Sequence, residues 1–126
     1  MKLTIRIFAI LALVLTFVIS SALAALADVE ATCEVSSDYS SCVYAWHESI
    51  SHDGDHDELV VYGELYEDDE MVDWNLGTVW PPYNDYVGVG TSYGNYNPQV
   101  CYYALTQSSA EDYGYTPWYD FADDYL

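Results

Sequence analysis

The chain has 126 residues and a formal net charge of −19; its two basic residues, Lys2 and Arg6, stand near the start, and all 21 carboxylates follow residue 27. Without Lys or Arg, the chain after residue 27 has no side chain suited to binding phosphate, which excludes nucleic acid and anionic membranes as partners. A composition with 14 Tyr and 4 Trp excludes a disordered chain and indicates one globular domain.

Residues 1–27 have the pattern of a secretory signal peptide. The two basic residues precede an apolar run, Ile7–Ile19, and small residues at 25–27 favour cleavage before Asp28, with a second small-residue site at 22–24. The run is too short to cross a membrane, since a spanning helix takes about 20 apolar residues. We therefore expect a secreted protein, extracellular or periplasmic, with no membrane span after removal of the leader.

Alternation of apolar and polar residues predicts the first two strands. The first covers Val29–Val35 and the second Cys42–Ile50. The expected buried face of the first strand consists of Val29, Ala31, Cys33 and Val35. That of the second consists of Cys42, Tyr44, Trp46 and Ile50.

Export to an oxidising compartment favours one disulfide among Cys33, Cys42 and Cys101. We predict the bridge Cys33–Cys42, which would close a short loop rich in Ser and Asp, and a free Cys101. The spacing from Cys42 to Cys101 is similar to that of the disulfide between the sheets of immunoglobulin domains. That pattern has Tyr two residues before the second Cys, however, and Gln99 stands there, so the similarity ends at the spacing.

The middle of the chain predicts a central strand and its neighbour. Leu59–Tyr66 is apolar on both faces, as expected for a strand inside a sheet. The acidic residues 67–70 form a turn into Met71–Leu76, where Val72, Trp74 and Leu76 share one face.

A fifth strand is expected over Tyr86–Tyr93, in which Gly88 and Gly90 leave room on one face for another group to lie close. The turn at 94–98 leads into a sixth strand, Val100–Thr106. An irregular acidic tail is expected from about 107 to 126, with a short seventh strand around 118–121 as the alternative.

These elements predict an all-β fold in a single domain, residues 28–126. The expected architecture is a small antiparallel β-sandwich, immunoglobulin-like, of six or seven strands. A small antiparallel β-barrel is the alternative.

The acidic segment after the second strand predicts a calcium site. The carboxylates stand at positions 1, 3, 5 and 12 of a calcium-binding loop and are Asp53, Asp55, Asp57 and Glu64. Glu58 stands where that loop has its glycine, so a solvated acidic loop without Ca²⁺ is the competing interpretation.

The three histidines, His47, His52 and His56, could bind zinc or copper together with an aspartate. Since no helix brings the last two to a common face, we expect ordinary surface histidines instead. No Gly-x-Ser-x-Gly turn frames a serine nucleophile, and the protein is expected not to be an enzyme.

Two roles remain for the tryptophans Trp46, Trp74, Trp80 and Trp118 and the many tyrosines. They could form an aromatic platform for sugar rings, or they could fill the core, since Ile and Phe are scarce after residue 27. Core filling is the preferred interpretation.

The sequence thus predicts a secreted, acidic, non-enzymatic β-sandwich with an extracellular structural or binding role, stabilised by Ca²⁺ if the acidic loop binds it. Its partner would be a carbohydrate or a protein. The alternative function is a carbohydrate-binding module, which exposed, coplanar Trp and Tyr on one sheet face would favour. An acidic surface adapted to high salt would explain the charge without any ligand.

Overall fold

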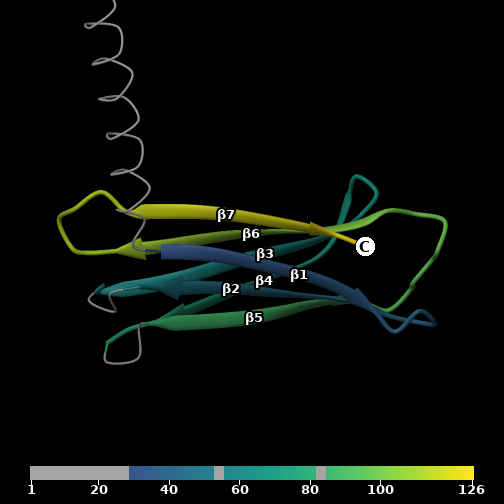
Figure 1. Cartoon of the computed structure of the whole chain (residues 1–126), viewed down its shortest axis with the longest axis horizontal. Helices are drawn as coiled ribbons and strands as arrows, with labels where there is room; N and C mark the ends of the chain where they lie inside the picture. Colours follow the sequence, from purple (N-terminus) through teal and green to yellow (C-terminus); the bar gives the residue numbers. More distant parts are fainter. Residues whose placement is uncertain (1–28, 53–55, 82–84) are drawn as a thin grey trace, which may run out of the picture.

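The computed structural model describes residues 29–52, 56–81 and 85–126, which form seven antiparallel strands and no helix. The strands run nearly along one axis, and the turns gather at the two ends (Figure 1). Their bounds are β1 (Val29–Ser37), β2 (Val43–Ser51), β3 (Glu58–Glu67), β4 (Glu70–Val79), β5 (Tyr86–Tyr93), β6 (Tyr102–Glu111) and β7 (Trp118–Tyr125).

Two sheets make up the sandwich, with the strand orders β1-β2-β5 and β4-β3-β6-β7. The order is that of immunoglobulin constant domains except for β4, which pairs with β3 and not with β5. The predicted sandwich is therefore confirmed. The alternative barrel is wrong, because no backbone ladder joins the two sheets within the described residues.

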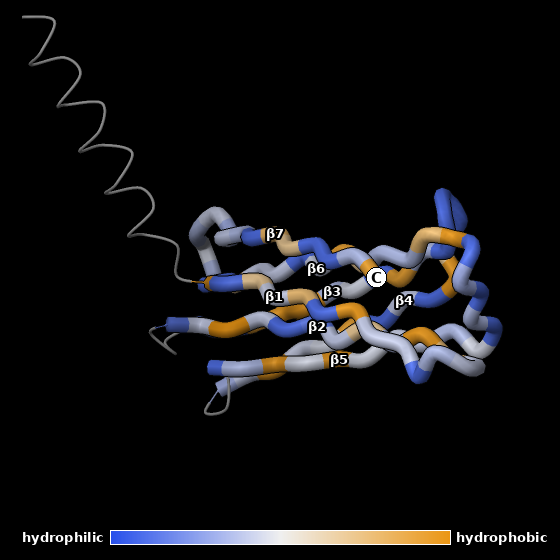
Figure 2. The backbone as a smooth tube through the Cα atoms, turned by 45° about the vertical axis from the view of Figure 1, so that its right-hand side comes forward, coloured by the Kyte–Doolittle hydropathy of each residue, from blue (hydrophilic) through white to orange (hydrophobic). Residues whose placement is uncertain are grey.

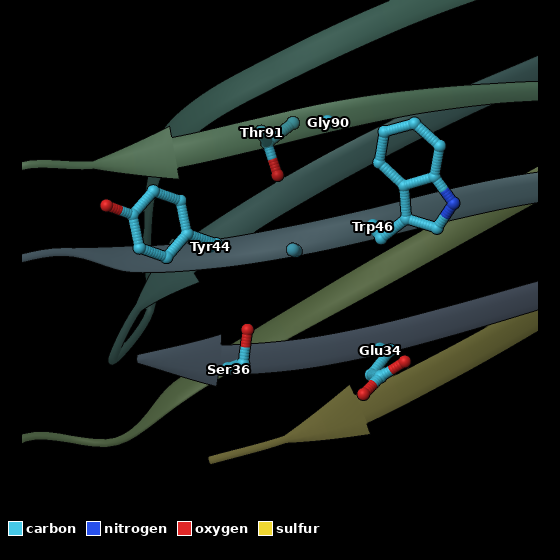
Figure 3. A pocket seen from close by; sticks show the side chains of 7 residues that line it. Glu34, Ser36, Tyr44, Trp46, Gly90 and Thr91 are labelled. Carbon is cyan, nitrogen blue, oxygen red and sulfur yellow. The ribbon is translucent and has the colours of Figure 1, made fainter. Parts of the chain in front are cut away.

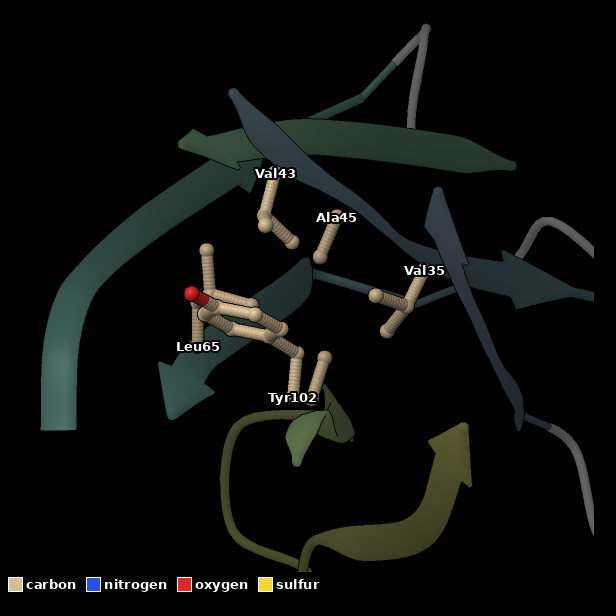
Figure 4. Close-up of a cluster of buried hydrophobic side chains, with 6 residues drawn as sticks. Val35, Val43, Ala45, Leu65 and Tyr102 are labelled. Carbon is tan, nitrogen blue, oxygen red and sulfur yellow. The ribbon is translucent and has the colours of Figure 1, made fainter. Parts of the chain in front are cut away.

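The core lies between the sheets in two clusters of small and medium apolar side chains. Hydrophobic and hydrophilic positions alternate along the strands, as period-two burial requires (Figure 2). One cluster, drawn in Figure 4, consists of Val35, Val43, Ala45, Leu65, Tyr102 and Ala104. The other consists of Val29, Leu59, Val61, Val87 and Ala110. The prediction that Tyr and Trp fill the core is confirmed only in part. Tyr102 is the one aromatic residue in these two buried sets, and Tyr93, Tyr96 and Trp118 pack against them half-buried. Trp46, Trp74 and Trp80 are exposed instead.

Strand β2 presents the opposite face to the one predicted. Its buried positions are Val43, Ala45, His47, Ser49 and Ser51. Tyr44 and Trp46 consequently point outward, over the β1-β2-β5 sheet. Small residues suit the narrow space between the sheets, and His47 is accepted there because it finds hydrogen-bond partners on both sides.

A bulge in β4 separates residues that were expected to share a face. Leu65 pairs with Asp73 and Tyr66 pairs with Met71, so Val72 is the extra residue. Val72 packs against the core, whereas Trp74, beyond the bulge, is exposed.

The predicted irregular tail is wrong and its alternative, a seventh strand, is confirmed, since β6 extends to Glu111 and β7 covers Trp118–Tyr125. Side chains of β7 also cap the neighbouring edge strand of the other sheet. The Asp120 Oδ2 accepts the backbone N–H of Ala31 at 2.8 Å, and the Asp124 Oδ2 accepts that of Val35 at 2.8 Å. Two aspartates four residues apart on β7 thus accept hydrogen bonds from two backbone amides four residues apart on β1.

The other open side of the sandwich is closed in the same way by β4 and β5. The Asp73 Oδ2 accepts the backbone N–H of Ser92 at 2.8 Å, and the Asn75 Nδ2 donates to the carbonyl of Gly90 at 2.9 Å. Side-chain hydrogen bonds, not backbone ladders, therefore join the edges of the two sheets.

The predicted Cys33–Cys42 disulfide is absent, and all three cysteines are free thiols. In the β1–β2 pairing Cys33 lies opposite His47, whereas Cys42 lies at the turn, where its carbonyl accepts the N–H of Asp38. Five residues of β-strand span about 16 Å, far beyond the Cα separation of about 7 Å that a disulfide tolerates. Pairing of the two strands thus keeps these thiols apart.

Candidate functional site

Of the four predicted calcium ligands, the two that the structure describes, Asp57 and Glu64, lie far apart. Asp53 and Asp55 lie outside the described residues. Asp57 lies just before β3, where its Oδ2 accepts the N–H of Tyr113 at 2.7 Å, and Glu64 lies well along the same strand. Seven residues of extended chain separate them by about 23 Å. Asp57 and Glu64 are therefore too far apart to bind one ion together, and the described residues contain no group of three or more metal-ligating side chains.

The prediction of surface histidines is also wrong for His47 and His56, which are both buried. The His47 ring lies between the sheets, with Nδ1 2.8 Å from the Thr106 Oγ1 and Nε2 2.9 Å from the Thr91 Oγ1. Burial lowers the pKa of His47, so the neutral ring is the stable form there. Gly63 makes room for this ring, because a Cβ at that position would overlap it.

The outer face of the three-stranded sheet carries a flat aromatic platform. The indole of Trp46 lies over the glycines of the neighbouring strand: a Cβ added to Gly90 would meet Cε3 and Cζ3 at 3.6 Å, and one added to Gly88 would meet Cζ2 at 2.7 Å. One ring face therefore lies against the bare backbone of β5, and the other faces solvent. The sequence prediction that these glycines leave room for a close neighbour is confirmed.

Hydrogen bonds fix the indole in this position. The Trp46 Nε1 donates to the Glu48 Oε1 at 2.8 Å, and the hydroxyl of Tyr86 donates to the same oxygen at 2.9 Å. The Thr32 hydroxyl donates to the Glu48 Oε2 at 2.7 Å. The hydrogen bonds from Thr32 and Trp46 lower the pKa of Glu48, so this carboxylate stays charged and the ring stays oriented.

A shallow groove of about 300 Å³ runs beside the platform (Figure 3). Its exposed lining includes Tyr44 and Trp46, which are 45% and 46% accessible, and the polar residues Glu34 and Ser36. Figure 3 shows the Tyr44 and Trp46 side chains on β2, with the Trp46 ring directed toward β5, and Glu34 and Ser36 on the adjacent β1. The groove thus combines two exposed ring faces with a carboxylate and a hydroxyl.

The tyrosines of the other sheet are arranged differently. Tyr66 and Tyr103 stack with centroids 4.7 Å apart and an interplanar angle of 2°, and Tyr125 continues the row at 5.7 Å from Tyr103. Rings stacked across neighbouring strands cover each other's faces and present their edges. This row therefore lacks the open ring faces of the Trp46 platform.

Sequence reasoning named Trp46 as a candidate and noted the space left by the glycines, but it did not connect the two. The connection depends on the pairing of Trp46 with Gly90 across β2 and β5, which the local sequence does not contain. Glu48 was not among the predicted site residues, although its partners Trp46 and Tyr86 make it the anchor of the site.

Comparison with protein-family models, curated protein sequences and solved structures gave no match. None of the residues that the structure describes forms a helix long and apolar enough to span a membrane.

Proposed function

We propose that this is a secreted, non-enzymatic binding domain that holds a neutral carbohydrate chain on the outer face of the β1-β2-β5 sheet. The observation that carries the proposal is the Trp46 indole, which lies flat on Gly88 and Gly90 with its second face open. The C–H face of a sugar ring is apolar and flat, and it would stack on such a surface.

The polar neighbours suit the rim of a sugar ring. Glu34 can accept hydrogen bonds from two sugar hydroxyls, and Ser36 can both donate and accept. Binding sites of this kind combine aromatic surface for area with a few polar groups for orientation. Because Glu48 already holds the indole, little ordering would be needed on binding.

Charge narrows the class of carbohydrate. Glu34 lines the groove itself, and the whole chain has 21 carboxylates against two basic residues. Sulfated or uronic polysaccharides would be repelled. A neutral glycan such as a glucan, a xylan or N-acetylated chitin fits the electrostatics.

The non-enzymatic part of the proposal is supported by the burial of His47, a histidine that could serve as a general base if it were accessible. His47 is 0% exposed, and its two ring nitrogens already bond to Thr106 and Thr91. Ser49, two residues along the same strand, is buried as well. A substrate lying in the groove would reach neither side chain.

The test is isothermal titration with hexasaccharides of cellulose, xylan, laminarin and chitin, together with pull-down on the insoluble polymers. Trp46→Ala should weaken binding at least about tenfold, as for the central aromatic anchor of an interface. Trp74→Ala is the matched control, because Trp74 is also exposed, at 56%, but lies on the other sheet. Equal losses in the two variants, or no binding to any of the glycans, would overturn the proposal.

A further inference from the structure

The outer face of the four-stranded sheet is broadly apolar and is left open by the fold. The pairings of β4, β3, β6 and β7 determine which side chains lie on this face. They are Met71, Trp74, Leu76, Tyr62, Glu64, Tyr66, Tyr103, Leu105, Gln107, Phe121, Asp123 and Tyr125. Trp74 and Phe121 are 56% and 69% exposed, and a contiguous exposed apolar patch of this kind is typical of an interaction site.

One carboxylate, that of Glu64, stands on the central strand β3 within this face. The Tyr62 hydroxyl donates to its Oε1 at 2.8 Å, and the Tyr66 hydroxyl donates to its Oε2 at 2.7 Å. These bonds raise the pKa of Tyr62, and they raise that of Tyr66 to about 12, so both phenols stay protonated as donors. The carboxylate is thereby held in one orientation, and each oxygen keeps a lone pair for a further donor.

A pocket of about 170 Å³ opens beside this carboxylate. Glu64 supplies a negative charge and Tyr62 and Phe121 supply aromatic walls; the remaining lining residues are Leu105, Thr106 and Gln107. Carboxylate and aromatic rings together attract a cation, through charge-assisted hydrogen bonds and through the negative faces of the rings.

The described part of this chain cannot supply that cation, because Lys2 and Arg6 are the only basic residues besides histidine and lie outside it. A second copy would bring the same lack of Lys and Arg and the same large negative charge. The complementary partner is therefore a different, basic chain.

We infer that the outer face of the four-stranded sheet docks a basic protein segment that inserts an arginine side chain into the pocket beside Glu64. Arginine fits better than lysine, because its planar guanidinium can stack on Phe121 while donating to both carboxylate oxygens. This site lies on the opposite sheet from the Trp46 platform, so the inference does not rest on the proposed carbohydrate function.

The experiment is isothermal titration with a short blocked peptide of alternating glycine and arginine. A version with citrulline, which keeps the shape and lacks the charge, is the ligand control. Glu64→Gln should weaken arginine-peptide binding about five- to tenfold, as expected when a charge-assisted hydrogen bond becomes neutral. The variant keeps an oxygen that can accept from Tyr62, so the fold is preserved.

Glu70→Gln is the matched variant, since it removes the same charge from an exposed position at the start of β4. It should change the affinity much less than Glu64→Gln, and Trp46→Ala should leave the affinity unchanged. Equal losses in Glu64→Gln and Glu70→Gln, equal binding of the citrulline peptide, or no binding of the arginine peptide would overturn the inference. Self-association or glycan binding that Glu64→Gln abolishes would also overturn it, by assigning the face to another occupant.

Discussion

Replacement of Gly88 by alanine should displace the platform without unfolding the domain. The new Cβ would stand 2.7 Å from the Trp46 Cζ2 and 2.6 Å from the Tyr86 hydroxyl. Since carbon atoms in contact lie about 3.5–4.0 Å apart, the indole must rise by about 1 Å. A ring lifted by that distance cannot keep its 2.8 Å hydrogen bond to Glu48.

The energetic consequence is modest for both stability and binding. Overpacking at a partly exposed ring costs about 1–2 kcal/mol, and the removal of glycine from a strand returns about 0.5–1 kcal/mol. The net loss of about 1 kcal/mol lowers the melting temperature by about 4–8 °C in a domain of this size. Glycan affinity should fall about fivefold through the lost stacking.

Gly90→Ala is the matched control, because its Cβ would meet the same indole at 3.6 Å, an ordinary contact. This variant should be more stable than the natural chain by about 0.5 kcal/mol. Thermal melting distinguishes the expected destabilisation in Gly88→Ala from the expected stabilisation in Gly90→Ala. Hydrogen exchange of the Trp46 indole N–H, measured by NMR, reports the bond to Glu48 without any ligand. If the two alanine variants melt alike and protect the indole equally, the geometry argued for the platform is wrong.

Three further predictions concern stability. Because burial lowers the pKa of His47 below 6.5, the unfolded chain binds a proton that the folded chain does not. The unfolding free energy should therefore fall as the pH drops through about 6.5, and this pH dependence should be weaker in His47→Gln. Denaturant titrations at several pH values test this, and equal slopes would contradict it. Gly63→Ala should cost about 3 kcal/mol or more in unfolding free energy, since the new methyl group overlaps a ring that is hydrogen-bonded on both sides, and His47→Ser in the same chain should recover part of the loss. No recovery would show that the ring is not the obstacle. Asp120→Ala and Asp124→Ala should each cost about 1–2 kcal/mol through the orphaned amides of β1, against less than about 0.5 kcal/mol for the exposed Asp123→Ala. Denaturant midpoints compare the three, and equal costs would refute the capping role.

Local patterns in the sequence were sufficient for most of the fold. The bounds Tyr86–Tyr93 were predicted as observed, since alternation and the turn residues on both sides define that strand. The central position of β3 followed from its apolar residues on both faces. These features depend on neighbours along the chain, which the sequence displays directly.

Features that depend on distant residues were mispredicted. The buried face of β2 includes His47 because Thr91 and Thr106, both far along the chain, satisfy its ring nitrogens. Strand β7, given only as the alternative to a tail, forms because it pairs with β6 and because Asp120 and Asp124 find amide partners on β1. Periodicity alone predicts that such polar residues lie on the surface. Hydrogen bonds between the two sheets allow them to be buried or half-buried instead.

The same limit applied to the sites. Spacing suggested that Asp57 and Glu64 converge, but an extended strand carries them apart. Trp46 became a platform only through its pairing with Gly90 on a strand more than forty residues later. The pattern of residue types was sufficient to identify candidate site residues. The register between the strands determines which of these residues lie in contact.

The aspartates that cap β1 also affect how neighbouring molecules meet. A free strand edge is a template on which a strand of another molecule can add, and this is how folded β-proteins begin to polymerise. Here the amides of Ala31 and Val35 are already bound to Asp120 and Asp124, and any approaching copy carries the same excess of negative charge. These caps and the acidity of the chain thus act together against the addition of a further strand at this edge of the sandwich.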